Sequence, residues 1–288
     1  MDIKPSENQS QNPLAKHFRQ PAIYIKLPSQ GQFWADGSLN LPANGEIGIM
    51  PMTTKDEITL KTPDALINGQ GVIDVIKSCC PSIVDPWQAP NIDVDSILIG
   101  IRIASYGNQM DFTSTCPHCE QSNDYAIDLG NTLSSVQAPD YNTPLTVNGL
   151  KIKVKPQPYF SFNRTNMIAF EEQQLLRSLS NIESGSDPAG ASEQFQKHLN
   201  KVIELNTALL SNSTESITTA DGEVVTDQQH ITEFYNNADN KMIKQVQDSI
   251  TKLNESGAIK PVNVNCNNEE CGKEFPISLT FDYASFFA

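Results

Sequence analysis

Residues 22–60 contain several short runs in which apolar and polar positions alternate, as short strands require. The run at 22–27 (AIYIKL) alternates, and the following PSQGQFWADGSL carries the Gly and Asp-Gly signals of turns. Residues 46–50 and 57–60 predict two further short strands on either side of the turn MPMTTKDE. This part of the chain is therefore expected to consist of short strands joined by turns.

Two later segments have apolar residues three or four positions apart, which predicts helices in DALINGQGVIDVIKSCC and DVDSILIGIRIASYG. The repeating positions are Val72, Val75, Ile76 and Cys79, then Ile97, Leu98, Ile101 and Ala104. Asp93 or Asp95 is expected to cap the second helix, because a carboxylate at that place accepts backbone N–H groups. The Ile and Leu content of this second segment would also suit a buried strand.

The rest of the chain predicts two β regions separated by helices. Short extended runs, MDFTST and NDYAIDL, flank one cysteine pair, and LTVNGLKIKVKP predicts a hairpin because Asn148-Gly149 favours a tight turn. Strand character returns in VNVNC and FPISLTFDY, around a second cysteine pair. Between these regions, with NIESGSDPAG as a flexible break, helices are expected at 159–183, 191–211, 227–236 and 239–255.

We therefore predict an α+β fold of mixed β segments, with a zinc-ribbon-like element and an inserted, mostly helical subdomain. Residues 1–18 form a mobile N-terminal arm, since their Pro, Asn, Gln and Ser cannot repay the entropy of ordering. Residues 19–158 together with 258–288 form the α/β core that carries the cysteine pairs, and residues 159–257 form the helical insertion.

Four cysteines are the strongest chemical signal. Cys116 and Cys119 have C-x2-C spacing, and Cys266 and Cys271 have C-x4-C spacing followed by a glycine. Each pair has the spacing of a knuckle whose thiolates converge on one cation, and four thiolates in a tetrahedron suit zinc. We expect one structural Zn²⁺ shared by both pairs; His118 is an alternative ligand within the first knuckle.

The cysteines allow other interpretations. A single C-x-x-C would suit ordinary thiols or a redox motif, but a thioredoxin-like βαβ context is missing. Cys79 and Cys80 precede Pro81 and are expected to end a buried helix and pack in the core. Because the remaining four close a coordination shell, the metal is expected to be structural and not catalytic.

Composition argues against several kinds of partner. The formal charge is −14 and no Lys/Arg run occurs, so nucleic acid is not expected to bind directly. No apolar run approaches the length of a membrane span, and residues 1–18 lack the apolar centre of a signal peptide, which predicts a protein that stays in the cytoplasm. Neither a phosphate-binding glycine loop nor a nucleophile with its base occurs, so we expect no enzyme and no small-molecule substrate.

Several ordered segments of residues 19–160 resemble a known family. RQPAIYIKLPSQGQFW, MPMTTKDEI, DALINGQGVIDVIKSC and DSILIGIRIASYGNQMDFTSTCPHC are similar to baseplate proteins of T-even-type contractile-tailed phages. The residues that carry the resemblance are Leu27, Pro28, Ser29, Pro51, Met52, Thr53, Asp56, Glu57, Arg102, Ser105, Tyr106, Gly107, Cys116 and Cys119.

The resemblance implies a component of the baseplate hub without enzymatic activity. Its partners would be other tail and baseplate proteins, met in the host cytoplasm during assembly, and its final place would be the virion tail baseplate. Two other functions stay open at this point: an assembly chaperone that is absent from the mature virion, and a zinc-ribbon protein that binds nucleic acid.

Overall fold

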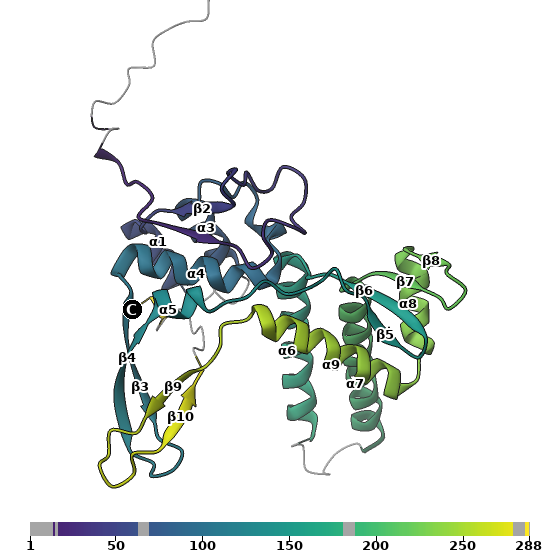
Figure 1. The fold of residues 1–288 in the computed structure, drawn as a ribbon. Helices are drawn as coiled ribbons and strands as arrows, with labels where there is room; N and C mark the ends of the chain where they lie inside the picture. Colours follow the sequence, from purple (N-terminus) through teal and green to yellow (C-terminus); the bar gives the residue numbers. More distant parts are fainter. Residues whose placement is uncertain (1–13, 15–16, 63–68, 181–187, 279–285, 288) are drawn as a thin grey trace, which may run out of the picture.

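The computed structural model describes residue 14 and residues 17–62, 69–180, 188–278 and 286–287 (Figure 1). Its first part contains β1 (Ile23–Lys26), β2 (Glu46–Ile49), α1 (Thr54–Leu60), α3 (Gln70–Cys79), η2 (Pro86–Gln88), α4 (Asn91–Tyr106), β3 (Gln109–Thr115), β4 (Ser122–Asp128) and α5 (Leu129–Ser134). Its second part contains β5 (Leu145–Val147), β6 (Leu150–Val154), α6 (Tyr159–Ser180), α7 (Pro188–Asn212), β7 (Thr214–Thr218), β8 (Val224–Val225), α8 (Gln228–Asn237), α9 (Asn240–Gly257), β9 (Val262–Asn265) and β10 (Glu274–Ile277). The predicted mixture of helices and small sheets is confirmed.

Helix α4 is the centre of the first hydrophobic cluster. The antiparallel pair β1–β2 packs on it with Ile25 and Ile49 facing inward. Gly100 of α4 makes this contact close, since a Cβ at that position would clash with Ile49 Cδ1. Residues Asn91–Tyr106 are helical along their whole length, which confirms the predicted helix and excludes the alternative of a buried strand. The middle of this helix is fully buried.

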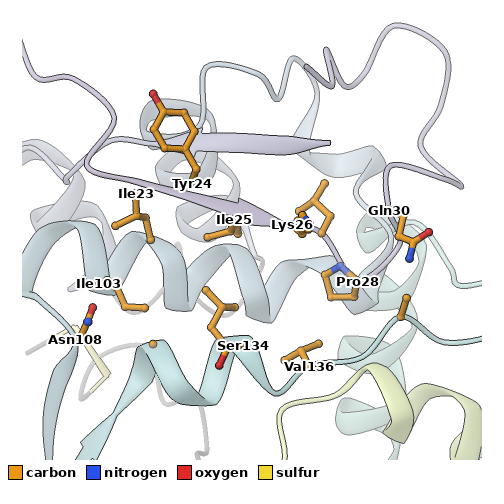
Figure 2. Close-up of a pocket in the computed structure, with 14 residues that line it drawn as sticks. Ile23, Tyr24, Ile25, Lys26, Pro28, Gln30, Ile103, Asn108, Ser134 and Val136 are labelled. Carbon is orange, nitrogen blue, oxygen red and sulfur yellow. The ribbon is translucent and has the colours of Figure 1, made fainter. Parts of the chain in front are cut away.

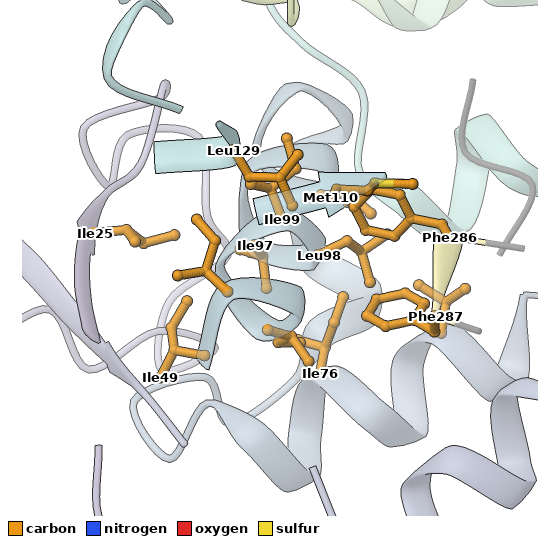
Figure 3. Packing of buried hydrophobic residues seen from close by; sticks show 14 of the residues in the cluster. Ile25, Ile49, Ile76, Ile97, Leu98, Ile99, Met110, Leu129, Phe286 and Phe287 are labelled. Atoms are coloured by element: carbon orange, nitrogen blue, oxygen red, sulfur yellow. The ribbon is translucent and has the colours of Figure 1, made fainter. Parts of the chain in front are cut away.

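Two aromatic residues from the far end of the sequence complete this cluster (Figure 3). Phe286 and Phe287 are only 2% and 3% exposed, and their rings meet edge to face with centroids 5.0 Å apart. The Arg102 Nε of α4 donates a hydrogen bond of 3.0 Å to the Phe286 carbonyl. A segment 184 residues away in sequence is therefore fastened to the central helix both by packing and by a buried hydrogen bond.

A second hydrophobic cluster is built around a four-stranded sheet in the order β5-β6-β7-β8. The predicted hairpin with Asn148-Gly149 at its turn is confirmed, with φ of 50° and 81° at these two residues. Its second strand pairs with β7, Ile152 opposite Ile217. The hairpin at 145–154 is thus joined to strands within the stretch that the sequence predicted as mostly helical, and α7, α8 and α9 contribute residues to the same cluster.

The strand predicted at 57–60 is wrong, because these residues belong to helix α1. Thr53 precedes the helix in extended conformation; its Oγ1 accepts from the Asp56 N–H, while Asp56 Oδ2 accepts from the Thr53 N–H. This reciprocal capping box satisfies two backbone donors that a helix start would otherwise leave unpaired. Cap chemistry therefore decides the conformation of a segment whose short apolar pattern suited a strand.

The cap predicted for α4 is also wrong. The helix begins at Asn91 after Pro90, and Asp93 lies inside the first turn with no exposed surface. Its carboxylate accepts from the Ser29 N–H at 2.8 Å, the Ser29 hydroxyl at 2.5 Å and the Trp34 Nε1–H at 2.9 Å. Asp93 therefore fastens the loop after β1 to α4, and its burial raises its pKa to about 6 even though these hydrogen bonds act to lower it.

Several predictions fall wholly or partly outside the described residues: the mobile arm at 1–18, most of the break at 181–190, and the strand character beyond residue 278. Among the four predicted helices of 159–255, all are confirmed with small shifts of their ends. A search of the described helices finds none with the length and hydropathy needed to cross a membrane.

Candidate metal centre

The first pair of cysteines lies at the tip of the β3–β4 hairpin. The strands pair from Gln109 opposite Asp128 to Thr115 opposite Ser122, which leaves residues 116–121 as the connecting loop. The loop is closed by a hydrogen bond of 2.9 Å from the Cys116 N–H to the Gln121 carbonyl. The hairpin register therefore fixes the position of the loop that carries Cys116 and Cys119.

The second pair lies at the tip of the β9–β10 hairpin, where Asn265 pairs with Glu274. The Cys266 N–H donates to the Lys273 carbonyl at 2.9 Å, and the Cys271 and Gly272 N–H groups both donate to the Asn268 carbonyl at 2.9 Å. Gly272 has a φ of 53°, a left-handed conformation that glycine adopts without steric cost. The extra two residues of this knuckle are thus taken up by a tight turn that ends at the glycine.

The two tips meet, and the four sulfur atoms lie within 4.8 Å of one another (Figure 1 shows the adjacent hairpins). Cys116 Sγ is 3.9 Å from Cys271 Sγ, and Cys119 Sγ is 3.6 Å from Cys266 Sγ. A tetrahedral zinc site with Zn–S bonds of about 2.3 Å places its sulfurs about 3.8 Å apart, so these separations suit shared coordination. They are far longer than a disulfide bond, and all four cysteines are free thiols.

The cluster is partly enclosed by protein, and N–H donors point at two of its sulfurs. Cys116 and Cys266 are buried, while the other two are partly exposed. The Asn123 Nδ2–H group points at Cys266 Sγ over 3.6 Å, and the His118 N–H points at Cys116 Sγ over 3.4 Å. Such donors around metal-bound sulfurs partly neutralise their charge. Asn123 was missed in the sequence, because nothing in its spacing distinguishes it from other strand residues.

The pKa values of the two buried thiols move in opposite directions. Burial acts to raise the pKa of Cys116, but hydrogen bonds from the backbone N–H groups of His118 and Cys119, together with those from the Cys266 and Cys119 thiols, lower it to about 7. The backbone N–H of Asn268 lowers the pKa of Cys266, yet burial and the neighbouring thiols raise it to about 11. One thiolate thus forms readily and disfavours the next, a repulsion that a bound divalent cation would remove.

The remaining predicted candidates lie elsewhere. The His118 side chain is exposed, and the cluster found among the described residues contains cysteines alone. Cys79 and Cys80 are fully buried where α3 ends, as predicted, and burial raises the pKa of Cys79 to about 11. Neither residue is part of the four-thiol cluster.

Most residues that carry the family resemblance hold the first cluster together. Ser29 binds Asp93, and Thr53 with Asp56 forms the capping box of α1. The Ser105 hydroxyl accepts from the Met52 N–H at 2.9 Å, the Tyr106 hydroxyl donates to Glu57 at 3.1 Å, and Arg102 lies 4.4 Å from the Tyr106 ring centroid. These motifs therefore build a scaffold of long-range contacts around α4, next to the hairpins that carry the cysteines.

The fold and the thiol cluster together define an α+β protein whose two distant hairpins meet at a candidate metal centre. A sequence model of the family described as T4 bacteriophage base plate protein matches residues 23–288, nearly the whole chain. The chain belongs to this family and is a phage baseplate protein. Comparison with curated proteins and with solved structures finds no match.

Proposed function

We propose that this protein is a non-catalytic structural component of the baseplate hub, held in shape by one Zn²⁺ bound to Cys116, Cys119, Cys266 and Cys271. The observation that supports it most directly is the convergence of four thiols from two hairpins, in a chain that belongs to a baseplate family. Other tail and baseplate proteins are its proposed partners, first in the host cytoplasm and then in the virion.

Four sulfur ligands would fill the tetrahedral shell that zinc prefers, which leaves no position for water or substrate. The ion would then supply cohesion instead of catalysis: structural zinc sites in small peptides contribute on the order of 10 kcal/mol at neutral pH. In this fold the ion would join hairpins whose cysteines are separated by 147 positions along the chain. That link would fix the β3–β4 and β9–β10 hairpins relative to each other as one rigid projection.

The metal proposal is tested by elemental analysis of the purified chain and by spectroscopy of a cobalt-substituted sample. We expect one zinc per chain and the charge-transfer absorption of four thiolate ligands. Cys271→Ser should lose the metal, whereas Cys80→Ala, which removes a thiol outside the cluster, should retain it. Equal metal content in both variants, or a spectrum with fewer sulfur ligands, would contradict the assignment.

The hub role is tested separately in purified mature particles. Mass spectrometry should find the chain in baseplates, and dissociation should recover it together with the central hub fraction. Recovery with assembly precursors combined with absence from finished particles would favour the assembly chaperone instead. The charge of −14 makes direct nucleic-acid binding an unfavourable alternative, which a mobility-shift assay at low salt would check.

A further inference from the structure

Among the described residues, β1 is paired along one edge alone, and a groove runs along its other edge (Figure 2). The sheet contains only β1 and β2, and within the described residues no backbone hydrogen bond joins Ile23–Lys26 to any other segment. In an antiparallel pair, alternate residues direct their N–H and C=O groups away from the partner strand. The free edge of β1 therefore presents backbone donors and acceptors to whatever enters the groove.

The groove has the shape and lining that an additional strand requires. Its volume is about 520 Å³; all four residues of β1 form one wall, Leu133, Ser134 and Val136 form the opposite wall, and Ile103 of α4 lies between them. In Figure 2, Ile23 and Ile25 point toward α4, while Tyr24 points to the other face of the sheet. A strand placed here would continue the β2–β1 sheet across α4 toward α5.

The lining also specifies the side chains of the incoming strand. Residues that face α4 would meet isoleucine, leucine and valine, which favours apolar side chains at every second position. Among the described residues that line the groove, Lys26 is the charged one; it is exposed at the end of β1, and the strand register places it across from Glu46 of β2, so its other side faces the groove edge. Opposite charges on neighbouring strands attract, so a carboxylate is favoured on the outer face of the incoming strand.

We propose that β1 accepts an extended segment of another protein by strand addition, with alternating apolar residues toward α4 and an acidic residue beside Lys26. Backbone hydrogen bonds would supply the affinity and the groove the selectivity, as in other cases of strand addition to a sheet edge. The proposal rests on the proposed function only for the source of the segment, which would be another baseplate subunit.

The test uses the purified full chain and two fluorescein-labelled synthetic peptides, TVEVT and its charge-swapped form TVKVT. We expect the chain to bind TVEVT, and to bind a form of it that is N-methylated at every residue at least tenfold more weakly, because N-methylation then removes the backbone donors on both edges of the peptide. Lys26→Glu should reverse the preference between the two peptides. The comparison with the N-methylated peptide requires no change in the groove itself.

Ser134 and Ser135 provide a matched pair of variants. Both are exposed, and both hydroxyls donate to a carbonyl three residues earlier, but only Ser134 lines the groove. Ser134→Trp should fill the groove and weaken TVEVT binding at least tenfold, whereas Ser135→Trp should leave it unchanged. The melting temperature of each variant would show that it remains folded.

Three results would overturn the proposal: no binding of TVEVT up to about 1 mM, equal binding of the N-methylated peptide, or unchanged binding by Ser134→Trp. A dimer of the parent chain that Ser134→Trp dissociates would also overturn it, since the occupant would then be a second copy. These measurements need neither particles nor zinc, so a failure here is distinguishable from a failure of the proposed hub role or metal site.

Discussion

Replacing Phe286 by alanine should be among the most destabilising single changes in the described part of the chain. The side chain is 2% exposed in the cluster around α4, so nearly all of its buried surface would be lost and a cavity left behind. Phe→Ala substitutions at buried sites cost about 3–5 kcal/mol, and an aromatic pair such as that with Phe287 adds about 0.5–1.5 kcal/mol beyond area. We therefore expect a loss of about 4 kcal/mol.

Urea unfolding followed by tryptophan fluorescence measures this loss where it arises, because Trp34 and Trp87 both pack against the same cluster. With an m value of about 3 kcal/mol/M, the midpoint should fall by about 1.3 M. Phe170→Ala is the control, since that side chain is 62% exposed on α6 and should change the midpoint little. A shift below about 0.3 M for Phe286→Ala would refute the view that the C-terminal aromatic pair is part of the core.

Three further outcomes are expected. Thr53→Ala removes the cap of α1 and should lower the free energy of unfolding, measured in urea, by about 1 kcal/mol. Thr54→Ala, at the exposed residue next to it, should change this free energy by less than about 0.5 kcal/mol. Because burial raises the pKa of Asp93 from 3.8 to about 6, the folded state holds that proton more tightly, and the Asp93 contribution to stability should fall by about 2.4 kcal/mol between pH 4 and 7. Asp93→Asn should lack this fall when its urea unfolding is compared with that of the parent chain at both pH values. Chelation of the proposed zinc should increase amide hydrogen exchange in both cysteine-bearing hairpins and leave the sheet of β5 to β8 protected; equal exchange with and without chelator would argue against a structural ion.

Local signals in the sequence account for what could be predicted. The spacings of the two cysteine pairs and the extended residues around them indicated two knuckles, and the structure brings their four sulfurs together. The Asn148-Gly149 pair indicated a hairpin turn, because both central residues of such a turn need positive φ, which few residue types adopt. In each case the residues that determine the structure lie within a few positions of one another, so a pattern could show them.

Contacts between distant segments could not be predicted in this way. The bond from Ser29 to Asp93 spans 64 positions, and that from Arg102 to the Phe286 carbonyl spans 184. A buried carboxylate with three donors has the same local pattern as an exposed helix cap, so Asp93 was assigned to the wrong role. The strand predicted at 57–60 is wrong for a different reason. The Thr53–Asp56 capping box is a local signal for the start of a helix, but the same residue types also suit a turn between two strands.

The place of Phe286 and Phe287 in the core has a consequence for synthesis on the ribosome. Helix α4 is translated early, yet its cluster lacks two aromatic rings until residues 286 and 287 have left the exit tunnel. A nascent or truncated chain would therefore leave part of this apolar surface uncovered, in a form that chaperones recognise and that aggregates readily. Assembly would then require chains that already include residues 286 and 287, since a shorter fragment would lack the completed scaffold that a partner has to meet.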